Sequence, residues 1–488
     1  MTEGKRRQEG LADFALADLV GTLGFGLMLS LLLIAFLSHG MGCAAADNPR
    51  LFAALRASGM VALACTLFAV QFFADRLSTR AAVPRLLVAA TLLVAAPAGV
   101  LYLTHGVALT AAVPILCWIV LGVGLGLTFP LWAVFSSMLP EKLVPQLTAL
   151  SFLVGGLWAG FALQIPDALQ PALIVLSVVL SAVLYGGYLH EAALPAAITR
   201  DESKERVSLS VRTCAAICCY GMVAALALQF LAAAGAHAGS LIAGGAFALA
   251  AAASWVAATL LGARNDPFSF SHSQRFAFPL LVAGLLLAVL GLPPNVTRWG
   301  MGLVLVGYFF LDVFNWSTLS SLCSRYRSQP IYQFALGRAP LGLGLALGWV
   351  IVAVLSDGSA PAVLEWPVVA AGAVLLLACS VAIAPYGSDT LTDKRSLDKL
   401  RENPLYSPDV KGGLFRRACL AVAEEGSLTP REREVLLLLA KGRSAAVIQE
   451  ELSISGGTVR THTYHIYRKL NVTSQQEIIS MVEEKARG

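Results

Sequence analysis

Apolar runs long enough to cross a membrane recur along the first four-fifths of the chain. A helix that spans the hydrocarbon core needs about 20 mostly apolar residues. Twelve stretches meet that requirement: 14–37, 51–73, 86–104, 111–136, 147–165, 170–190, 209–233, 240–262, 276–293, 299–320, 336–356 and 365–385. The charged segment at 191–208 divides them six and six. The pattern predicts an all-α membrane domain of twelve transmembrane helices in two six-helix halves.

The composition changes towards the C-terminus. Of the 488 residues, 57% are hydrophobic and only 13% are charged, whereas soluble domains carry about 25% charged residues. Of the 35 lysines and arginines, 19 lie in residues 1–390 and 16 in the remaining 98. We therefore expect a polytopic membrane domain at 1–385, a cytoplasmic linker at 386–426 and a soluble domain at 427–488.

The positions of lysine and arginine between the apolar stretches predict the orientation. Cytoplasmic loops are enriched in these residues. The N-terminal segment and every second loop hold fifteen of them, with Arg338 counted as a loop residue, whereas the opposite loops hold only Arg50 and Arg298. We expect a multi-pass protein of the cell membrane with both termini in the cytoplasm. Ala44 and Ala46, ahead of Asp47, fit a cleavage site, so a cleaved signal peptide is an alternative to the first span. The first apolar stretch is, however, long for a signal peptide.

The six-and-six arrangement resembles the major facilitator superfamily, in which two six-helix halves move about a central cavity. The resemblance covers residues 14–385 and is one of architecture. The family's glycine-rich loop between spans 2 and 3 is matched here by Asp75, Arg76 and Arg80, but both of its glycines are missing. This departure weakens the expectation of active transport.

Polar residues inside the apolar stretches mark a candidate ligand site, because ionisable groups are costly in lipid and are usually functional there. An acid at Asp312 fits a ligand-binding or proton-carrying group, and equally a structural hydrogen bond to a neighbouring helix. Arg56 is either its partner or a side chain that extends to the membrane interface. The candidate cavity, for an unknown small molecule, comprises Asp312, Asn315, Trp316, Trp132 and Gln229.

The linker contains helix breakers and then a short helix. Pro404, Pro408, Gly412 and Gly413 interrupt any long helix between 386 and 413. Apolar residues at helical spacing predict a helix over 414–425. This helix either simply precedes the soluble domain or forms a dimer contact.

The soluble domain reads as four helices. Thr429, Pro430 and Glu432 form a capping box for a helix that ends at Gly442. Ser444 caps a second helix at 445–452, a third runs through Leu470, and a fourth follows Ser474. The second and third helices predict a helix-turn-helix, whose third helix enters the major groove of DNA. The stretch 453–476 contains no acidic residue, as a phosphate-lined groove demands.

These residues resemble the LuxR-type (GerE-like) helix-turn-helix family. The resemblance is carried by Leu428, Thr429, Arg431, Glu432, Glu434, Val435, Leu436, Gly442, Ile448, Leu452, Ile454, Ser455, Thr458, Val459, Arg460, His462, Ile466, Tyr467, Lys469, Leu470 and Val472. It implies base contacts by Arg460, Thr461 and Tyr464, and phosphate contacts by Thr458, Arg468 and Lys469. Departures occur at 445–449 and at Gln475, where family members usually carry an arginine.

Together these features predict a membrane-bound one-component transcription regulator that senses a small molecule and binds double-stranded promoter DNA, as a homodimer on two-fold sites. The alternative is a major-facilitator-type transporter with a regulatory DNA-binding tail. No catalytic triad, metal-ligand spacing or glycine-rich phosphate loop occurs, so we expect no enzyme activity, metal or cofactor.

Overall fold

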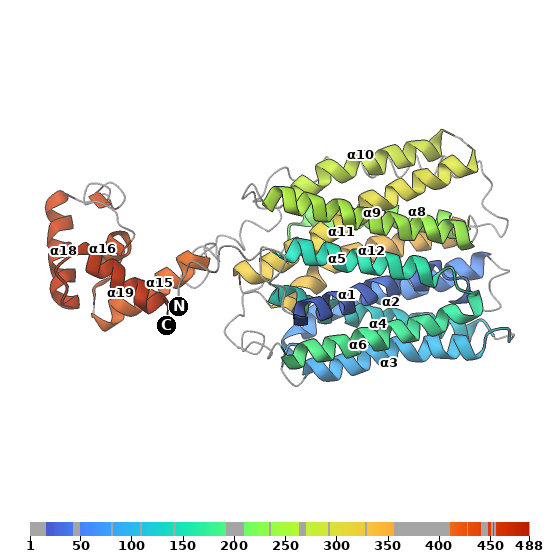
Figure 1. The fold of residues 1–488 in the computed structure, drawn as a ribbon, viewed down its shortest axis with the longest axis horizontal. Helices are drawn as coiled ribbons and strands as arrows, with labels where there is room; N and C mark the ends of the chain where they lie inside the picture. Colours follow the sequence, from blue (N-terminus) through green and yellow to red (C-terminus); the bar gives the residue numbers. More distant parts are fainter. Residues whose placement is uncertain are drawn as a thin grey trace. The chain divides into compact units, whose positions relative to one another are not determined.

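The computed structural model describes residues 16–41, 49–79, 82–107, 110–139, 143–191, 209–233, 236–262, 270–290, 293–326, 329–355, 410–426, 428–440, 448–449, 452 and 455–487. The chain divides into two compact units, residues 1–394 and 395–488. The regular elements of both are helices, which confirms the predicted all-α class (Figure 1).

The N-terminal unit is a bundle of long helices. They are α1 (Leu16–Leu37), α2 (Pro49–Leu77), α3 (Ala82–Leu103), α4 (Ala112–Met138), α5 (Val144–Ala162), α6 (Gln170–Glu191, preceded by the 3-10 turn η4 at Asp167–Leu169), α8 (Val211–Ala233), α9 (Ala236–Gly262), α10 (Phe270–Val289), α11 (Pro294–Tyr326) and α12 (Pro330–Leu355).

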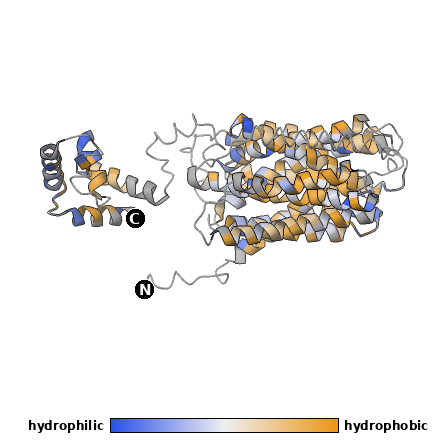
Figure 2. Ribbon diagram, turned by 90° about the horizontal axis from the view of Figure 1, so that it is seen from above, coloured by the Kyte–Doolittle hydropathy of each residue, from blue (hydrophilic) through white to orange (hydrophobic). Residues whose placement is uncertain are grey.

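Within the described residues, ten of these helices are long and apolar enough to cross a membrane. The eleventh, α10, contributes a shorter apolar segment, Phe276–Ala288. Figure 2 shows that hydrophobic residues predominate along the helices of the bundle. Large apolar side chains such as those of Phe72 and Leu103 are about 80% exposed, as expected of a surface that faces lipid. The span expected at 365–385 and the alternative cleavage site near Asp47 lie outside the described residues.

Helices α1–α6 and α8–α12 form two groups that meet along two seams, where α2 packs against α12 and α5 against α9 (Figure 1). Small residues permit a close approach at the second seam. A Cβ atom added to Gly244 of α9 would lie 2.9 Å from the Cα atom of Gly160 in α5. At the same seam, the Phe152 and Phe247 rings stack with centroids 5.0 Å apart.

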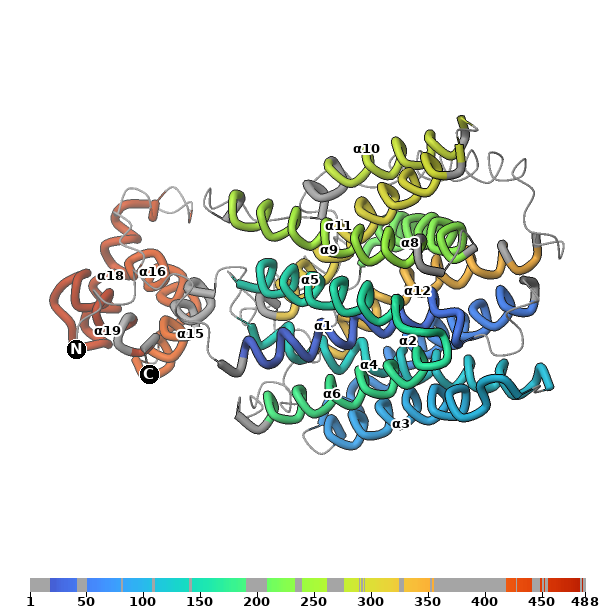
Figure 3. The backbone as a smooth tube through the Cα atoms, turned by 45° about the vertical axis from the view of Figure 1, so that its right-hand side comes forward, coloured from blue at the N-terminus to red at the C-terminus, as the bar shows by residue number. Residues whose placement is uncertain are grey.

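The C-terminal unit contains α15 (Val410–Glu425), α16 (Pro430–Ala440), α18 (Gly456–Leu470) and α19 (Gln475–Arg487). The second helix expected at 445–452 falls mostly outside the described residues. Helix α15 packs against α19 and α16 (Figure 3), and its side chains Ala418, Cys419 and Val422 are buried in the same core as Val435 and Ile466. The helix assigned to the linker is therefore part of this unit, and that apolar face is not available for a dimer contact.

Candidate DNA-binding surface and membrane-domain sites

Helix α18 has a defined beginning and end. Ser455 caps it, because the Ser455 Oγ accepts a hydrogen bond from the backbone N–H of Thr458 at 3.2 Å. Asn471 ends it in the left-handed conformation, with φ 53°. The 15-residue helix between these caps is the third helix predicted from the sequence.

One side of α18 is buried and the other carries the residues expected to meet DNA. Val459 and Ile466 lie in the core of the unit. The six residues expected at DNA are all exposed: Thr458, Arg460, Thr461, Tyr464, Arg468 and Lys469. At about 100° per residue, Thr461, Tyr464 and Arg468 lie near the middle of the exposed arc. Tyr464 keeps 63% of its surface exposed.

Glu432 connects α16 to α18. The predicted capping box is present: the Thr429 backbone N–H donates to Glu432 Oε2 at 2.8 Å, and the Glu432 N–H donates to Thr429 Oγ1 at 3.4 Å. Lys469 Nζ donates to the same Oε2 at 2.7 Å, and His465 Nδ1 lies 3.7 Å from Oε1. Burial would raise the pKa of Glu432, but the hydrogen bonds from Lys469 and Thr429 outweigh it and lower the pKa to about 2.

Lys469 therefore has a role inside the unit that sequence reasoning missed. Its ammonium group is held by a carboxylate that is only 4% exposed. The capping box gave a sequence signal for the position of this carboxylate, because a Glu at the third position of a helix turns back towards the beginning of that helix. What the sequence did not indicate is that α18 supplies a cation at that point.

In the membrane unit, Asp312 of α11 pairs with Arg338 of α12. The two oxygens of Asp312 each accept a hydrogen bond from Arg338, with Nη2 to Oδ2 at 3.2 Å. Both side chains are less than 10% exposed. The orientation count treated Arg338 as a loop residue, but it lies in a helix. The partner of Asp312 is therefore Arg338 and not Arg56. Of the two interpretations of Asp312, the geometry is that of a structural contact between helices.

The other predicted cavity residues do not converge on one space. Asp312 and Asn315 line a cavity of only about 20 Å³, enough for roughly one water molecule. Trp132 and Trp316 pack on either side of Phe25, with ring centroids 5.6 and 4.7 Å from it. Gln229 lies apart from them, on α8, where it accepts a hydrogen bond from Arg56 at 3.4 Å. In this conformation the expected ligand cavity is closed.

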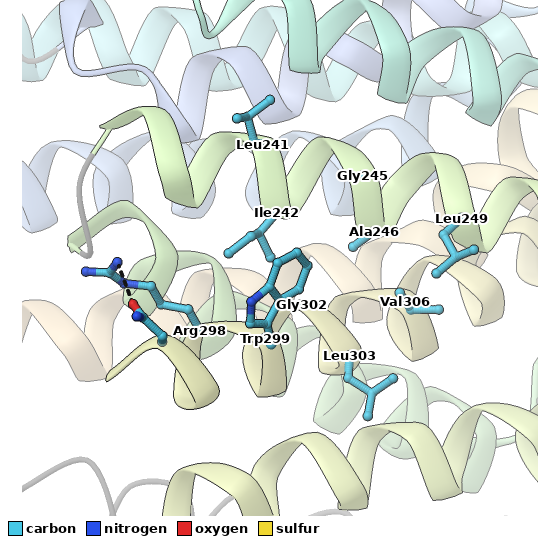
Figure 4. A pocket seen from close by; sticks show the side chains of 11 residues that line it. Leu241, Ile242, Gly245, Ala246, Leu249, Arg298, Trp299, Gly302, Leu303 and Val306 are labelled. Atoms are coloured by element: carbon cyan, nitrogen blue, oxygen red, sulfur yellow. Dashed lines mark hydrogen bonds between the residues drawn. The ribbon is translucent and has the colours of Figure 1, made fainter. Parts of the chain in front are cut away.

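A groove of about 670 Å³ lies elsewhere, between α9 and α11 (Figure 4). Leu241 and Leu249 border it from α9, and Trp299 borders it from α11 beside Arg298, which donates to Asn295 Oδ1 at 3.4 Å. Leu241, Leu249 and Trp299 are all more than half exposed. This groove shares no residue with the predicted cavity.

Comparison with known proteins assigns the C-terminal unit. Residues 426–482 match the family described as "Bacterial regulatory proteins, luxR family". The C-terminal unit carries a LuxR-type helix-turn-helix domain. This result confirms the resemblance predicted from the sequence.

Relatives of the LuxR-type domain are bacterial regulators. The chain is 38% identical over 81 residues to the transcriptional regulatory protein DesR of Bacillus subtilis, a match that covers 17% of this chain and 37% of DesR. It is 45% identical over 69 residues to the transcriptional regulatory protein MctR of Rhizobium johnstonii, which covers 14% of this chain and 32% of MctR. These matches span about a third of each relative.

The membrane unit is similar in fold to solved transporters. A bacterial homologue of the iron transporter ferroportin, in an outward-facing state, aligns with a TM-score of 0.54 and 14% identity over 76% of this chain and 98% of that one. The nucleoside transporter NupG aligns with a TM-score of 0.50 and 14% identity over 76% of this chain and all of NupG. Identity this low shows the fold alone, which is of the major facilitator type.

One departure from the LuxR-type pattern has a structural explanation. Gln475, which stands where family members usually carry an arginine, donates from Nε2 to the backbone oxygen of Leu439 at 2.9 Å. Leu439 lies in the last turn of α16, where carbonyl groups lack partners within the helix. Gln475 therefore joins α19 to the end of α16.

Proposed function

We propose that this protein is a membrane-bound one-component transcription regulator. The observation that carries the proposal is the exposed face of α18, rich in basic and polar groups, on a LuxR-type domain in the same chain as a transporter-like bundle. In helix-turn-helix proteins such a face enters the major groove, while cationic side chains neutralise phosphates. The bilayer is the second partner, and both termini lie in the cytoplasm, where DNA is accessible.

The contacts divide by their place on α18. Arg460, Thr461 and Tyr464 touch bases, and Thr458, Arg468 and Lys469 touch phosphates. Of the phosphate ligands, Lys469 contributes least, because Glu432 already holds its ammonium group. Two-fold DNA sites then call for a homodimer, with its contact elsewhere than the buried face of α15.

The regulator responds to a small molecule that binds one conformation of the bundle better than another. Only such differential affinity shifts an equilibrium between states. The closed cavity at Asp312 and the two seams between the halves are consistent with a bundle that opens to admit the molecule.

Genome-wide DNA occupancy of the tagged full-length protein tests the proposal. We expect discrete promoter peaks that disappear when Arg460→Ala and Tyr464→Ala are combined. Arg431→Ala is the matched control, because Arg431 is an exposed arginine on α16 that pairs with Glu434; its peaks should remain. Peaks that persist in the double variant, or an absence of peaks under all growth conditions, would remove the proposal.

The fold of the membrane unit supports a second candidate, a transporter with a regulatory tail. Uptake of labelled solutes into vesicles distinguishes the two functions. A regulator that only senses gives no uptake above that of empty vesicles, whereas a transporter gives uptake that depends on the bundle and not on Arg460.

A further inference from the structure

Among the described residues of the membrane unit, two arginines are buried, and their surroundings differ. Arg338 is neutralised by Asp312 through two hydrogen bonds. Arg56, in α2, is only 1% exposed, and no carboxylate among the described residues pairs with it. A buried charge without a partner is strongly unfavourable, so such groups are normally paired.

The nitrogen atoms of Arg56 that lack hydrogen-bond partners lie together on one edge of its guanidinium group. Its Nη1 atom donates to Gln229 Oε1 at 3.4 Å, which is a contact with a neutral amide. Its Nε and Nη2 atoms are buried and have no hydrogen-bond partner. These two atoms lie on one edge of the planar guanidinium group, and that edge binds a carboxylate through two parallel hydrogen bonds.

Aromatic rings enclose the same guanidinium group. Its central carbon lies 3.7 Å from the ring centroid of Phe52 and 5.3 Å from that of Trp349. Trp349 is fully buried, and its Nε1–H also lacks a partner. Its ring stands 6.0 Å from that of Phe36. Three unpaired donors and apolar ring faces thus occur together in the junction between α2, α8 and α12.

We propose that Arg56 anchors a binding site for an organic monocarboxylate with an aromatic body. The carboxylate of the ligand accepts from Arg56 Nε and Nη2 as Asp312 accepts from Arg338, and its ring packs among Phe52, Trp349 and Phe36. The proposal deepens the sensing function and rests on it. Because Arg56 is on a helix of the first group and Gln229 and Trp349 are on helices of the second, a ligand here binds across the junction and alters how the halves meet.

Thermal unfolding of the full-length protein in detergent, followed by tryptophan fluorescence, tests this site without DNA. Benzoate is the probe, benzamide is its neutral match and acetate is a carboxylate without a ring. We expect benzoate to raise the unfolding temperature in a concentration-dependent way, as a ligand of the folded state must. Benzamide and acetate should require at least about ten times the concentration for the same shift.

Variants assign the effect to Arg56. In Arg56→Gln the apparent Kd for benzoate should rise at least about 30-fold, as for the loss of one partner of a buried charge pair. Arg56→Lys keeps the charge but not the two-donor edge, and should give an intermediate loss. Arg298→Gln is the control, because Arg298 is a half-buried arginine that bonds Asn295 away from the Arg56 site, and it should respond as the wild type does.

Three results would overturn the site: no greater stabilisation by benzoate than by benzamide, an equal response to acetate, or an unchanged benzoate response in Arg56→Gln. The DNA-occupancy experiment is separate. An absence of promoter peaks, or peaks that persist in the Arg460→Ala and Tyr464→Ala double variant, would overturn the regulator and leave the carboxylate site in place. Failure of benzoate binding would leave the DNA result intact.

Discussion

Glu432, in the first turn of α16, and Lys469, near the end of α18, form an ion pair with Oε2 and Nζ 2.7 Å apart. The pair fixes α18 to α16, the first helix of the LuxR-type domain. Glu432 is 4% exposed and Lys469 is 37% exposed, so the pair lies at the edge of the core. The orientation of α18 therefore depends on a charged contact as well as on Val459 and Ile466.

This pair predicts acid sensitivity of the domain. The pKa of Glu432 is lowered from its ordinary value of 4.5 to about 2 in the folded state. The resulting stabilisation is complete above pH 4.5 and is lost as the pH falls towards 2. After allowance for solvent around Lys469, it amounts to about 1–2 kcal/mol. Urea unfolding of the C-terminal unit between pH 2 and 7 should show this slope. A Glu432→Gln variant with an equally steep slope would contradict the assignment.

Arg468 and Lys469 are adjacent cations with different expected effects on DNA binding. Arg468→Ala should lower affinity for all DNA sequences and reduce the salt dependence of log K by about one ion, with the unfolding temperature unchanged. Lys469→Ala should lower the unfolding temperature of the domain because it leaves Glu432 without its cation. Fluorescence anisotropy at several salt concentrations, together with thermal unfolding, separates the two. Identical behaviour of both variants would argue against the division.

Helix α15 predicts where a stable fragment must begin. Ala418, Cys419 and Val422 are buried against the rest of the C-terminal unit. A fragment at 427–488 should therefore have a lower unfolding midpoint and a broader transition than one at 408–488, because its core is open to water. Circular dichroism during heating measures both. Equal midpoints for the two fragments would show that α15 does not stabilise the unit.

The Asp312–Arg338 pair predicts a non-additive response. Asp312→Asn should destabilise the membrane unit by about 3–5 kcal/mol, because it leaves the Arg338 charge buried without a partner. Asp312→Leu combined with Arg338→Met should cost much less, because no charge remains. Thermal unfolding in detergent of the single and double variants measures the coupling. Additive losses would mean that the two side chains act independently.

The seam between α5 and α9 predicts a contrast between neighbouring glycines. A Cβ at Gly244 would lie 2.9 Å from the backbone of Gly160, whereas a Cβ at Gly245 meets nothing within 4 Å. Gly244→Ala should lower stability by about 1–3 kcal/mol through overpacking, and Gly245→Ala should leave it unchanged. Unfolding temperatures of the two variants provide the comparison. A tolerated Gly244→Ala would show that the halves separate there without cost.

Much of the fold followed from local rules. Apolar length alone located ten helices that the structure describes as able to span a membrane, and the capping box of Thr429 and Glu432 located the beginning of α16. These rules work because lipid and helix caps act on a few consecutive residues. The class of the C-terminal domain was equally readable, because its motif positions occur at fixed spacing.

The contacts between distant residues were not readable in the same way. Arg338 was counted with a loop because it follows shortly after Arg325 and Arg327, although it lies well inside α12. Arg56 meets Gln229, which is 173 residues away, through a packing arrangement that no local pattern specifies. The spacing of Ala418 and Val422 showed which face of α15 is apolar but not which helices cover it.

Because α15 belongs to the folded C-terminal unit, the chain available as a spacer is shorter than the linker expected from the sequence. If the last span ends near 385, about 24 residues precede Val410, and even at full extension they reach only about 80 Å. For the regulator proposed above, a promoter must then come within the reach of this spacer and the folded unit at its end to be occupied. Under that proposal, chromosome position and the crowding of DNA near the cell periphery become determinants of which genes respond, alongside the base sequence itself.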